Sequence, residues 1–183
     1  MDHPFLIGSK VYLRPLESTD APTLLPWVND PEVTRTLKLY QPLNLSAEEE
    51  FIAQVNQNDK ELILGIVVRE TDKLVGDLGL TLIDYRCRRA CFGLMIGDKS
   101  AWGKGYGSEA TALILAHAFE TLNLNRVWLN VYEYNHRAIH VYEKLGFRRE
   151  GVLRQDHYRE GRYWDTIAMA ILRAEWLAGK SQG

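Results

Sequence analysis

Three glycines alternate with larger residues in the stretch Trp102 to Gly107, which reads WGKGYG. An apolar run, Cys91 to Ile96, precedes this stretch, and a helical pattern rich in alanine and leucine begins at Ser108. The first turn of a helix carries backbone N–H groups without an internal partner, and the helix dipole adds positive charge there. Glycine also lets the backbone approach a ligand closely. The stretch therefore predicts a phosphate-binding turn between a strand and a helix, with Lys104 as a supporting cation.

The spacing of these glycines separates the turn from two common nucleotide-binding motifs. A Walker A loop has its lysine after the last glycine, whereas Lys104 precedes Gly105 and Gly107. The dinucleotide fingerprint requires G-x-G-x-x-G after an early strand, and neither condition is met here. A loop that needs glycine only in order to turn is the competing interpretation.

A second motif follows about thirty residues later, at Asn135 to Phe147, and reads NHRAIHVYEKLGF. Together the two stretches resemble the GNAT superfamily of N-acetyltransferases, whose pyrophosphate loop reads [QR]-x-x-G-x-[GA] and whose later motif reads N-x-x-[AS]-x-x-x-Y-x-K-x-G-F. The opening GSKVYLRPLESTDAPTLLPWVNDPEV and the tryptophan at Trp102 are similar to the branch that contains ribosomal-protein alanine acetyltransferases and spermidine acetyltransferases. The resemblance extends from about Lys10 to Ala174.

The resemblance implies transfer of an acetyl group from acetyl-CoA to a primary amine by direct attack on the thioester. The acceptor would be a small-molecule amine such as a polyamine, or a protein N-terminal alanine. An amine is mostly protonated at neutral pH, so it must lose a proton before it attacks. The oxyanion that then forms needs hydrogen-bond donors, and the departing thiolate benefits from an acid.

The resemblance also implies where CoA binds. Its pyrophosphate would lie on the glycine loop, and its pantetheine arm would pair with the preceding strand as an added strand does. That arm would occupy a wedge where the strands at 90–96 and 126–133 splay apart, and a backbone N–H there would contact the oxyanion. The expected cofactor-binding residues are Leu94, Met95, Ile96, Trp102, Gly103, Lys104, Gly105, Tyr106, Gly107, Ser108, Asn130 and Asn135. No metal site is expected.

Two residues of the second motif are the catalytic candidates. Tyr142 occupies the position from which many relatives protonate the thiolate, although packing in the core is an alternative role. Asn135 is well placed to cap the helix expected at 137–145, to contact the pantetheine, or to do both.

The general base stays open. Several relatives carry a glutamate where this chain has Cys91, and a buried, inert cysteine is the simplest interpretation of that thiol. Glu133, Asp84 or a water relay are alternatives. A catalytically silent CoA-binding or sensing module of the same fold is therefore the alternative function.

The pattern of the chain predicts an α/β (α+β) fold, and the resemblance implies that it is of the GNAT type. Strands are expected at 10–16, 62–69, 74–82, 90–96, 126–133, 147–153 and 162–172, with a loop at 156–161 between the last two. They would form a single, mixed, mostly antiparallel sheet of about seven strands, flanked by about four helices. Among these helices, one should begin at a capping box, Ser46 to Glu49, and another should span 108–122. The 183 residues are expected to form one domain, with its motif-bearing core at about 10–174.

Composition limits the partners. A formal net charge of −2 gives no electrostatic reason to bind nucleic acid or an anionic membrane. The chain begins without the pattern of a signal peptide, and a cytoplasmic location is expected. Cys87 and Cys91 lack the further ligands of a structural zinc site. A homodimer is expected by analogy alone.

Overall fold

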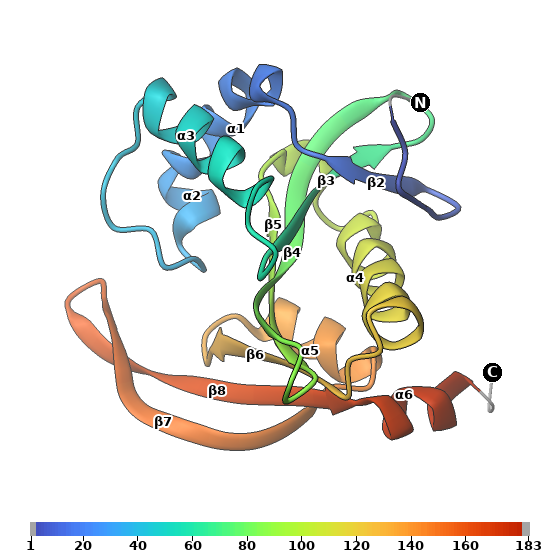
Figure 1. Cartoon of the computed structure of the whole chain (residues 1–183). Helices are drawn as coiled ribbons and strands as arrows, with labels where there is room; N and C mark the ends of the chain where they lie inside the picture. Colours follow the sequence, from blue (N-terminus) through green and yellow to red (C-terminus); the bar gives the residue numbers. More distant parts are fainter. Residues whose placement is uncertain (1–2, 181–183) are drawn as a thin grey trace.

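An eight-stranded mixed sheet organises the chain, and its strand order is β1-β2-β3-β4-β5-β6-β8-β7 (Figure 1). The computed structural model describes residues 3–180. Every neighbouring pair of strands is antiparallel except β5 and β6. The strands are β1 (Leu6–Ile7), β2 (Val11–Pro15), β3 (Leu62–Val68), β4 (Lys73–Asp84), β5 (Arg89–Ile96), β6 (Arg126–Tyr132), β7 (Arg148–Arg159) and β8 (Arg162–Leu172). The predicted fold class is confirmed, with one short strand, β1, in addition.

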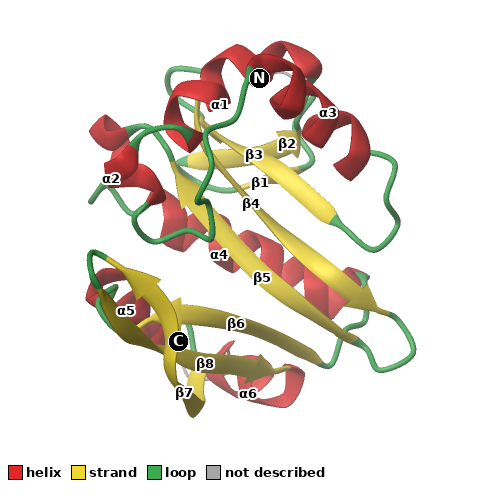
Figure 2. Ribbon diagram, turned by 90° about the vertical axis from the view of Figure 1, so that its left-hand side faces the viewer, coloured by secondary structure: helices red, strands yellow, loops and turns green. Residues whose placement is uncertain are grey.

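Helices cover the sheet on both faces (Figures 1 and 2). Alternating side chains along the strands feed two cores, because successive residues of a strand point to opposite faces. One core packs against α4 and α5 and contains Leu78, Ile114 and Phe119. The other packs against α1 and α3 and contains Leu24, Ile52 and Met95. The helices are α1 (Ala21–Val28), α2 (Pro31–Thr34), α3 (Leu45–Val55), α4 (Tyr106–Ala116), α5 (His136–Lys144) and α6 (Arg173–Lys180).

β5 and β6 run side by side for only three residues. Arg89 to Cys91 pair with Arg126 to Trp128, and beyond these residues no pairing joins the two strands. Figure 2 shows β5 and β6 diverging from this point. We call the opening the split. It leaves one backbone edge of β5 and one of β6 without a strand partner, as the predicted wedge requires.

Three local predictions were wrong. β7 continues to Arg159, so the expected loop at 156–161 reduces to the tight turn Glu160–Gly161, where both residues have positive φ (54° and 79°). Asn44, not the Ser46 box, caps α3, because its side chain accepts the N–H of Ala47 at 2.9 Å. The helix expected at 108–122 begins at Tyr106 and changes to a π-helical turn at His117–Thr121.

The helix count also exceeds the prediction. Six α-helices lie within residues 3–180, whereas about four were expected. The count includes α2, which is a single turn, and α6, which had no predicted counterpart. Within the same residues, no helix combines the length and the hydropathy that crossing a membrane requires.

Candidate active site

The glycine loop (Trp102–Gly107) forms an anion-binding turn at the start of α4. Gly103 and Gly105 have φ values of 80° and 84°, in the left-handed region where side chains cause strain. Gly105 is the N-cap residue of α4, and no side chain caps this end of the helix. The first N–H groups of α4, which belong to Tyr106, Gly107 and Ser108, are therefore available to a ligand.

Lys10 adds a cation that the sequence analysis missed. Its Nζ donates a hydrogen bond to the carbonyl oxygen of Lys104 at 3.4 Å. The carboxylate of Glu109, in the first turn of α4, holds the Lys10 segment in place by accepting its N–H (3.0 and 3.1 Å) and the hydroxyl of Ser9 (2.8 Å). Lys10 and Lys104 are 94 residues apart, so no local pattern could have placed them together.

The lack of a side chain at Gly107 allows α4 to pack closely on β5. A Cβ atom at this position would lie 3.2 Å from Leu94 Cδ2 and 3.6 Å from Ile96 Cγ1. Leu94 and Ile96 thus point toward α4, whereas Met95 belongs to the opposite core and is 8% exposed. Of these three predicted pantetheine contacts, Met95 could therefore contact a ligand in the split only through its backbone.

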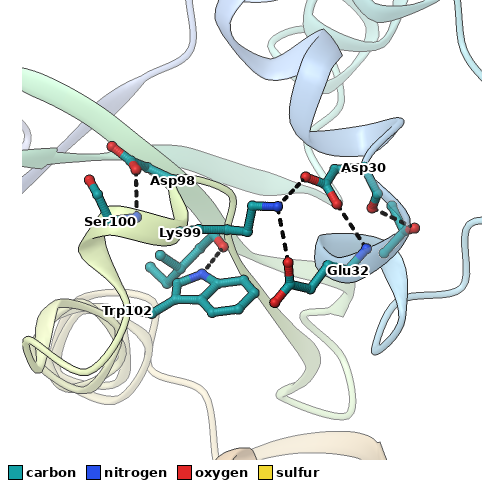
Figure 3. A network of polar contacts seen from close by, with 8 residues as sticks. Asp30, Glu32, Asp98, Lys99, Ser100 and Trp102 are labelled. Carbon is teal, nitrogen blue, oxygen red and sulfur yellow. Dashed lines mark hydrogen bonds and ion pairs between the residues drawn. The ribbon is translucent and has the colours of Figure 1, made fainter.

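Trp102 braces the loop, since its indole N–H donates to the carbonyl oxygen of Ile96 at 2.7 Å (Figure 3). Beside it, Lys99 forms ion pairs with Asp30 (2.7 Å) and Glu32 (3.0 Å), which lie at the start of α2. Asp98 accepts the N–H of Ser100 at 2.8 Å. The segment between β5 and α4 is therefore anchored both to its own strand and to α2.

Tyr142 and Asn135 lie on the far side of the split, on α5. The ring of Tyr142 packs edge-on against Phe92, with centroids 6.0 Å apart, and Phe92 directly follows the last paired residue of β5. Burial raises the pKa of Tyr142 to about 12. Its hydroxyl makes no hydrogen bond within residues 3–180, so no contact of the described fold depends on it.

Asn135 is the N-cap of α5, as predicted, and its Oδ1 accepts the N–H of Ala138 at 3.2 Å.

Replacing Asn135 by alanine is expected to lower the free energy of unfolding by about 1 kcal/mol, because the N–H of Ala138 loses its acceptor. Asn135→Asp is the matched control, since a carboxylate caps equally well but lacks the amide N–H₂ donor. Denaturant unfolding and acetyl-CoA affinity, measured on both variants, separate the two roles: if affinity falls only in Asn135→Ala, Asn135 acts through the cap alone.

The opposite face of the sheet, turned toward α1–α3, forms what we call the acceptor face. It carries Asp77, Gly79 and Thr81 of β4 and their register partners Met95, Gly93 and Cys91 of β5. The face continues onto β6, where Cys91 pairs with Trp128 and the exposed Asn130 follows two residues later. The side chain of Asn130 thus points away from the core face of β6, and its proposed contact with the cofactor remains a prediction.

An aromatic cluster lies at the β7–β8 end of this face. The rings of Tyr132 and His157 stack with centroids 3.8 Å apart, and Tyr134 stacks on Tyr132 at 5.4 Å. Burial, followed by the charge of Arg159, lowers the pKa of His157. His157 Nε2 and Thr166 Oγ1 are buried and lack a hydrogen-bond partner within the described residues. Such atoms are available to water or to a ligand.

Two contacts join the end of α2 to β7 and to the segment between β6 and α5. Arg159 donates to the carbonyl of Thr34 at 3.0 Å, and the hydroxyl of Tyr134 donates to the carbonyl of Arg35 at 2.7 Å. A hollow of about 450 Å³ lies beside them. Its lining residues are Val28, Asn29, Pro31, Thr34, Leu39, Tyr40, Gln41, Pro42, Tyr158 and Arg159. A larger hollow of about 590 Å³ lies by Asp84 and Arg89, at the end of β5 remote from the glycine loop, so size alone does not locate the site.

The open question of the general base concerns Glu133, Asp84 and the position occupied by Cys91. Burial raises the pKa of the Cys91 thiol, which therefore stays protonated. Glu133 accepts the backbone N–H of Asp165 at 3.0 Å. Asp84 accepts the N–H of Cys87 at 2.8 Å, a bond that lowers its pKa.

Comparison with known proteins identifies the family. The model of the acetyltransferase (GNAT) domain matches residues 10–148. The chain belongs to the GNAT family. A spermidine N(1)-acetyltransferase of Escherichia coli is 32% identical over 168 residues, which cover 92% of this chain and 89% of that protein. An uncharacterised N-acetyltransferase of Bacillus licheniformis is 32% identical over 174 residues, which cover 93% and 97%.

The solved structures agree with this assignment. The spermidine N-acetyltransferase of Vibrio cholerae, in complex with CoA and spermine, superposes with a TM-score of 0.84 at 28% identity, over 93% of this chain and 99% of that one. GNAT enzymes use acetyl-CoA as the acetyl donor. The uncapped start of α4, the left-handed glycines and the nearby Lys10 are suited to its phosphates.

Proposed function

We propose that this GNAT enzyme transfers the acetyl group of acetyl-CoA to a primary amine of a small, polyamine-like acceptor by direct attack. One observation carries the proposal: the split opens between β5 and β6 with the glycine loop at one end and Tyr142 beside its apex. A thioester held along the open edge of β5 would therefore lie between a phosphate grip and a proton donor. Backbone groups of Leu94 to Ile96 would bind the pantetheine and stabilise the oxyanion.

Tyr142 is the proposed acid. A tyrosine hydroxyl is protonated at neutral pH, and without a partner among the described residues this one is available to protonate the departing sulfur. This argues against the alternative of a catalytically silent CoA-binding module. Such a module has no need of an unpaired hydroxyl beside the split.

The hollow lined by Thr34, Tyr158 and Arg159 is of a size that suits a small acceptor. Its volume of about 450 Å³ lies within the roughly 300–1,000 Å³ of pockets for small molecules. The relatives named as spermidine acetyltransferases support a polyamine. The acidic side chains Asp77 and Glu48 near the acceptor face are complementary to a cationic amine.

Steady-state kinetics with a panel of amines tests the proposal. Spermidine is expected to have a kcat/KM at least about tenfold above that of a peptide with N-terminal alanine, since one or two additional binding contacts are worth that factor. A glucosamine acceptor serves as a third class. Efficient acetylation of the peptide alone would contradict the small-acceptor assignment, and CoA binding without turnover of any amine would favour the silent module.

A further inference from the structure

Asp77 lies on the acceptor face, and its carboxyl group has no structural role among the described residues. Leu78 and Leu80 point into the α4 core, so the alternation of β4 puts Asp77 on the opposite face. Its register partner on β5 is Met95, in the middle of the segment that borders the split. Within residues 3–180 its side chain, which is half-buried, has no hydrogen bond or ion pair. A half-buried carboxyl without a partner calls for a functional explanation.

Open space adjoins Asp77 on the same face. Gly79 and Gly93 are register partners between the Asp77–Met95 pair and the Thr81–Cys91 pair. Ile63 of β3 covers Gly79, because its Cγ1 lies 2.8 Å from the Cβ position there, so the opening lies over Gly93. A Cβ atom at Gly93 would meet nothing within 4 Å. At about 3.3 Å per residue, this opening lies roughly 7 Å along the strands from Asp77. The opening over Gly93 therefore exposes β5 two residues from Met95, the register partner of Asp77.

Glu48 lies behind Asp77. It comes from the first turn of α3, is 2% exposed, and makes no hydrogen bond or ion pair to a described residue. Burial, and then the charge of Glu48, raise the pKa of Asp77 to about 7. Burial likewise raises the pKa of Glu48. The ionised form of a carboxyl buried next to a second one is unfavourable unless a cation joins them, and without a cation the group stays protonated to a higher pH.

No positive charge on the other elements around Asp77 lowers the pKa of its carboxyl. Its register partner on β3 is Gly65, and neither β3 nor α1 contains a charged residue. Arg14 of β2, the register partner of Gly65, lies on the same face and forms an ion pair with Asp20 at 2.7 Å. Lys38 acts on Cys91 and His157, at the other end of the face. A cationic ligand is therefore the missing partner of the Asp77–Glu48 pair.

We propose that Asp77, supported by Glu48, receives the ammonium group of the acceptor and takes its proton. This inference rests on the proposed function. It supplies a general base in place of the glutamate that several relatives carry at the position of Cys91. The carboxylate of Asp77 takes one proton from the ammonium group. The freed nitrogen forms the C–N bond to the acetyl carbon, the C–S bond breaks with its electrons on sulfur, and Tyr142 protonates the sulfur. The second proton of the nitrogen restores Tyr142, and Asp77 releases its proton to solvent.

The pH profile of kcat/KM for spermidine tests the role. In the wild type it should rise with pH through a group that titrates near 7, because the ionised form of Asp77 is the active one. Asp77→Asn should abolish this rise of kcat/KM with pH and lower kcat about 100-fold or more, while acetyl-CoA affinity stays unchanged. Glu48→Gln should shift the rise of kcat/KM to lower pH, since the substitution removes a negative charge that disfavours ionisation of Asp77. Glu49→Gln, an exposed neighbour on α3, is the matched control and should change neither quantity.

Stability provides an independent readout. The folded-state pKa of Asp77 is raised from 3.8 to about 7, so this group destabilises the fold increasingly as pH rises from about 4 to about 7. Asp77→Asn should therefore melt at a higher temperature than the wild type at pH 8, and the difference should shrink at pH 4. An inactive variant that is also less stable at pH 8 would indicate a structural role and overturn the inference.

Failure of this inference is distinguishable from failure of the proposed function. If the wild type acetylates spermidine and Asp77→Asn keeps its rate and pH profile, the base is elsewhere and the function stands. If the wild type acetylates no amine, the proposed function fails. In that case carbon-13 NMR of the Asp77 carboxyl still decides the inference: a midpoint near 7 that falls when spermidine is added supports it, and a midpoint near 4 that ignores spermidine overturns it.

Discussion

Replacing Tyr142 by phenylalanine is expected to lower kcat about 100- to 1,000-fold, the usual contribution of a positioned general acid. The ring contact with Phe92 is retained in this variant, and no hydrogen bond within the described residues is lost. KM for acetyl-CoA and the melting temperature should therefore change little. Steady-state kinetics against both substrates measures the effect.

A thiol leaving group that needs no acid provides the control for Tyr142. If the tyrosine protonates sulfur, an acetyl thioester of a more acidic thiol should lose less activity in Tyr142→Phe than acetyl-CoA does. A kcat within about threefold of the wild type on acetyl-CoA would contradict the assignment. Tyr142 would then be a residue of the α5 core alone.

A negative charge at position 105 is expected to weaken acetyl-CoA binding about 100-fold, because like charges placed in contact cost several kcal/mol. Gly105→Asp and Gly105→Asn form a matched pair: both residues tolerate a positive φ better than others do, and they differ essentially in charge. The aspartate would also attract the ammonium group of Lys10, which lies 3.7 Å from the Cβ position.

The matched pair separates electrostatics from backbone strain. Calorimetric titration with acetyl-CoA should show a modest loss for Gly105→Asn and a loss of about 100-fold for Gly105→Asp. Raising the salt concentration should narrow the difference, because salt screens exposed charges. Equal losses in both variants would show that strain, rather than phosphate binding, governs position 105.

Local patterns predicted the parts of the site that local physics determines. The alternating glycines predicted a turn with left-handed residues, and Asn135 predicted the start of α5, since each depends on residues within one helical turn. The length of β7 was mispredicted because residues 154–159 are almost all polar, which resembles a loop until the tight turn at Glu160–Gly161 is considered.

The residues that the sequence analysis missed depend on contacts distant in sequence. Lys10 reaches the glycine loop only because Glu109 holds its segment against α4. Asp77 looks like the polar residue of an ordinary strand, LVGDLGL, until the register with Met95 and the helix that carries Glu48 surround it. Neither arrangement has a signature in a short stretch of sequence.

The most direct test of the account is to incubate the protein with acetyl-CoA and spermidine and to quantify all products by mass spectrometry. The account predicts equal amounts of free CoA and N-acetylated spermidine, with no acetyl group on Cys91, because the raised pKa of that thiol keeps it protonated. Acetylated Cys91 as an intermediate, or bound acetyl-CoA without any acetylated amine, would contradict direct transfer across the split.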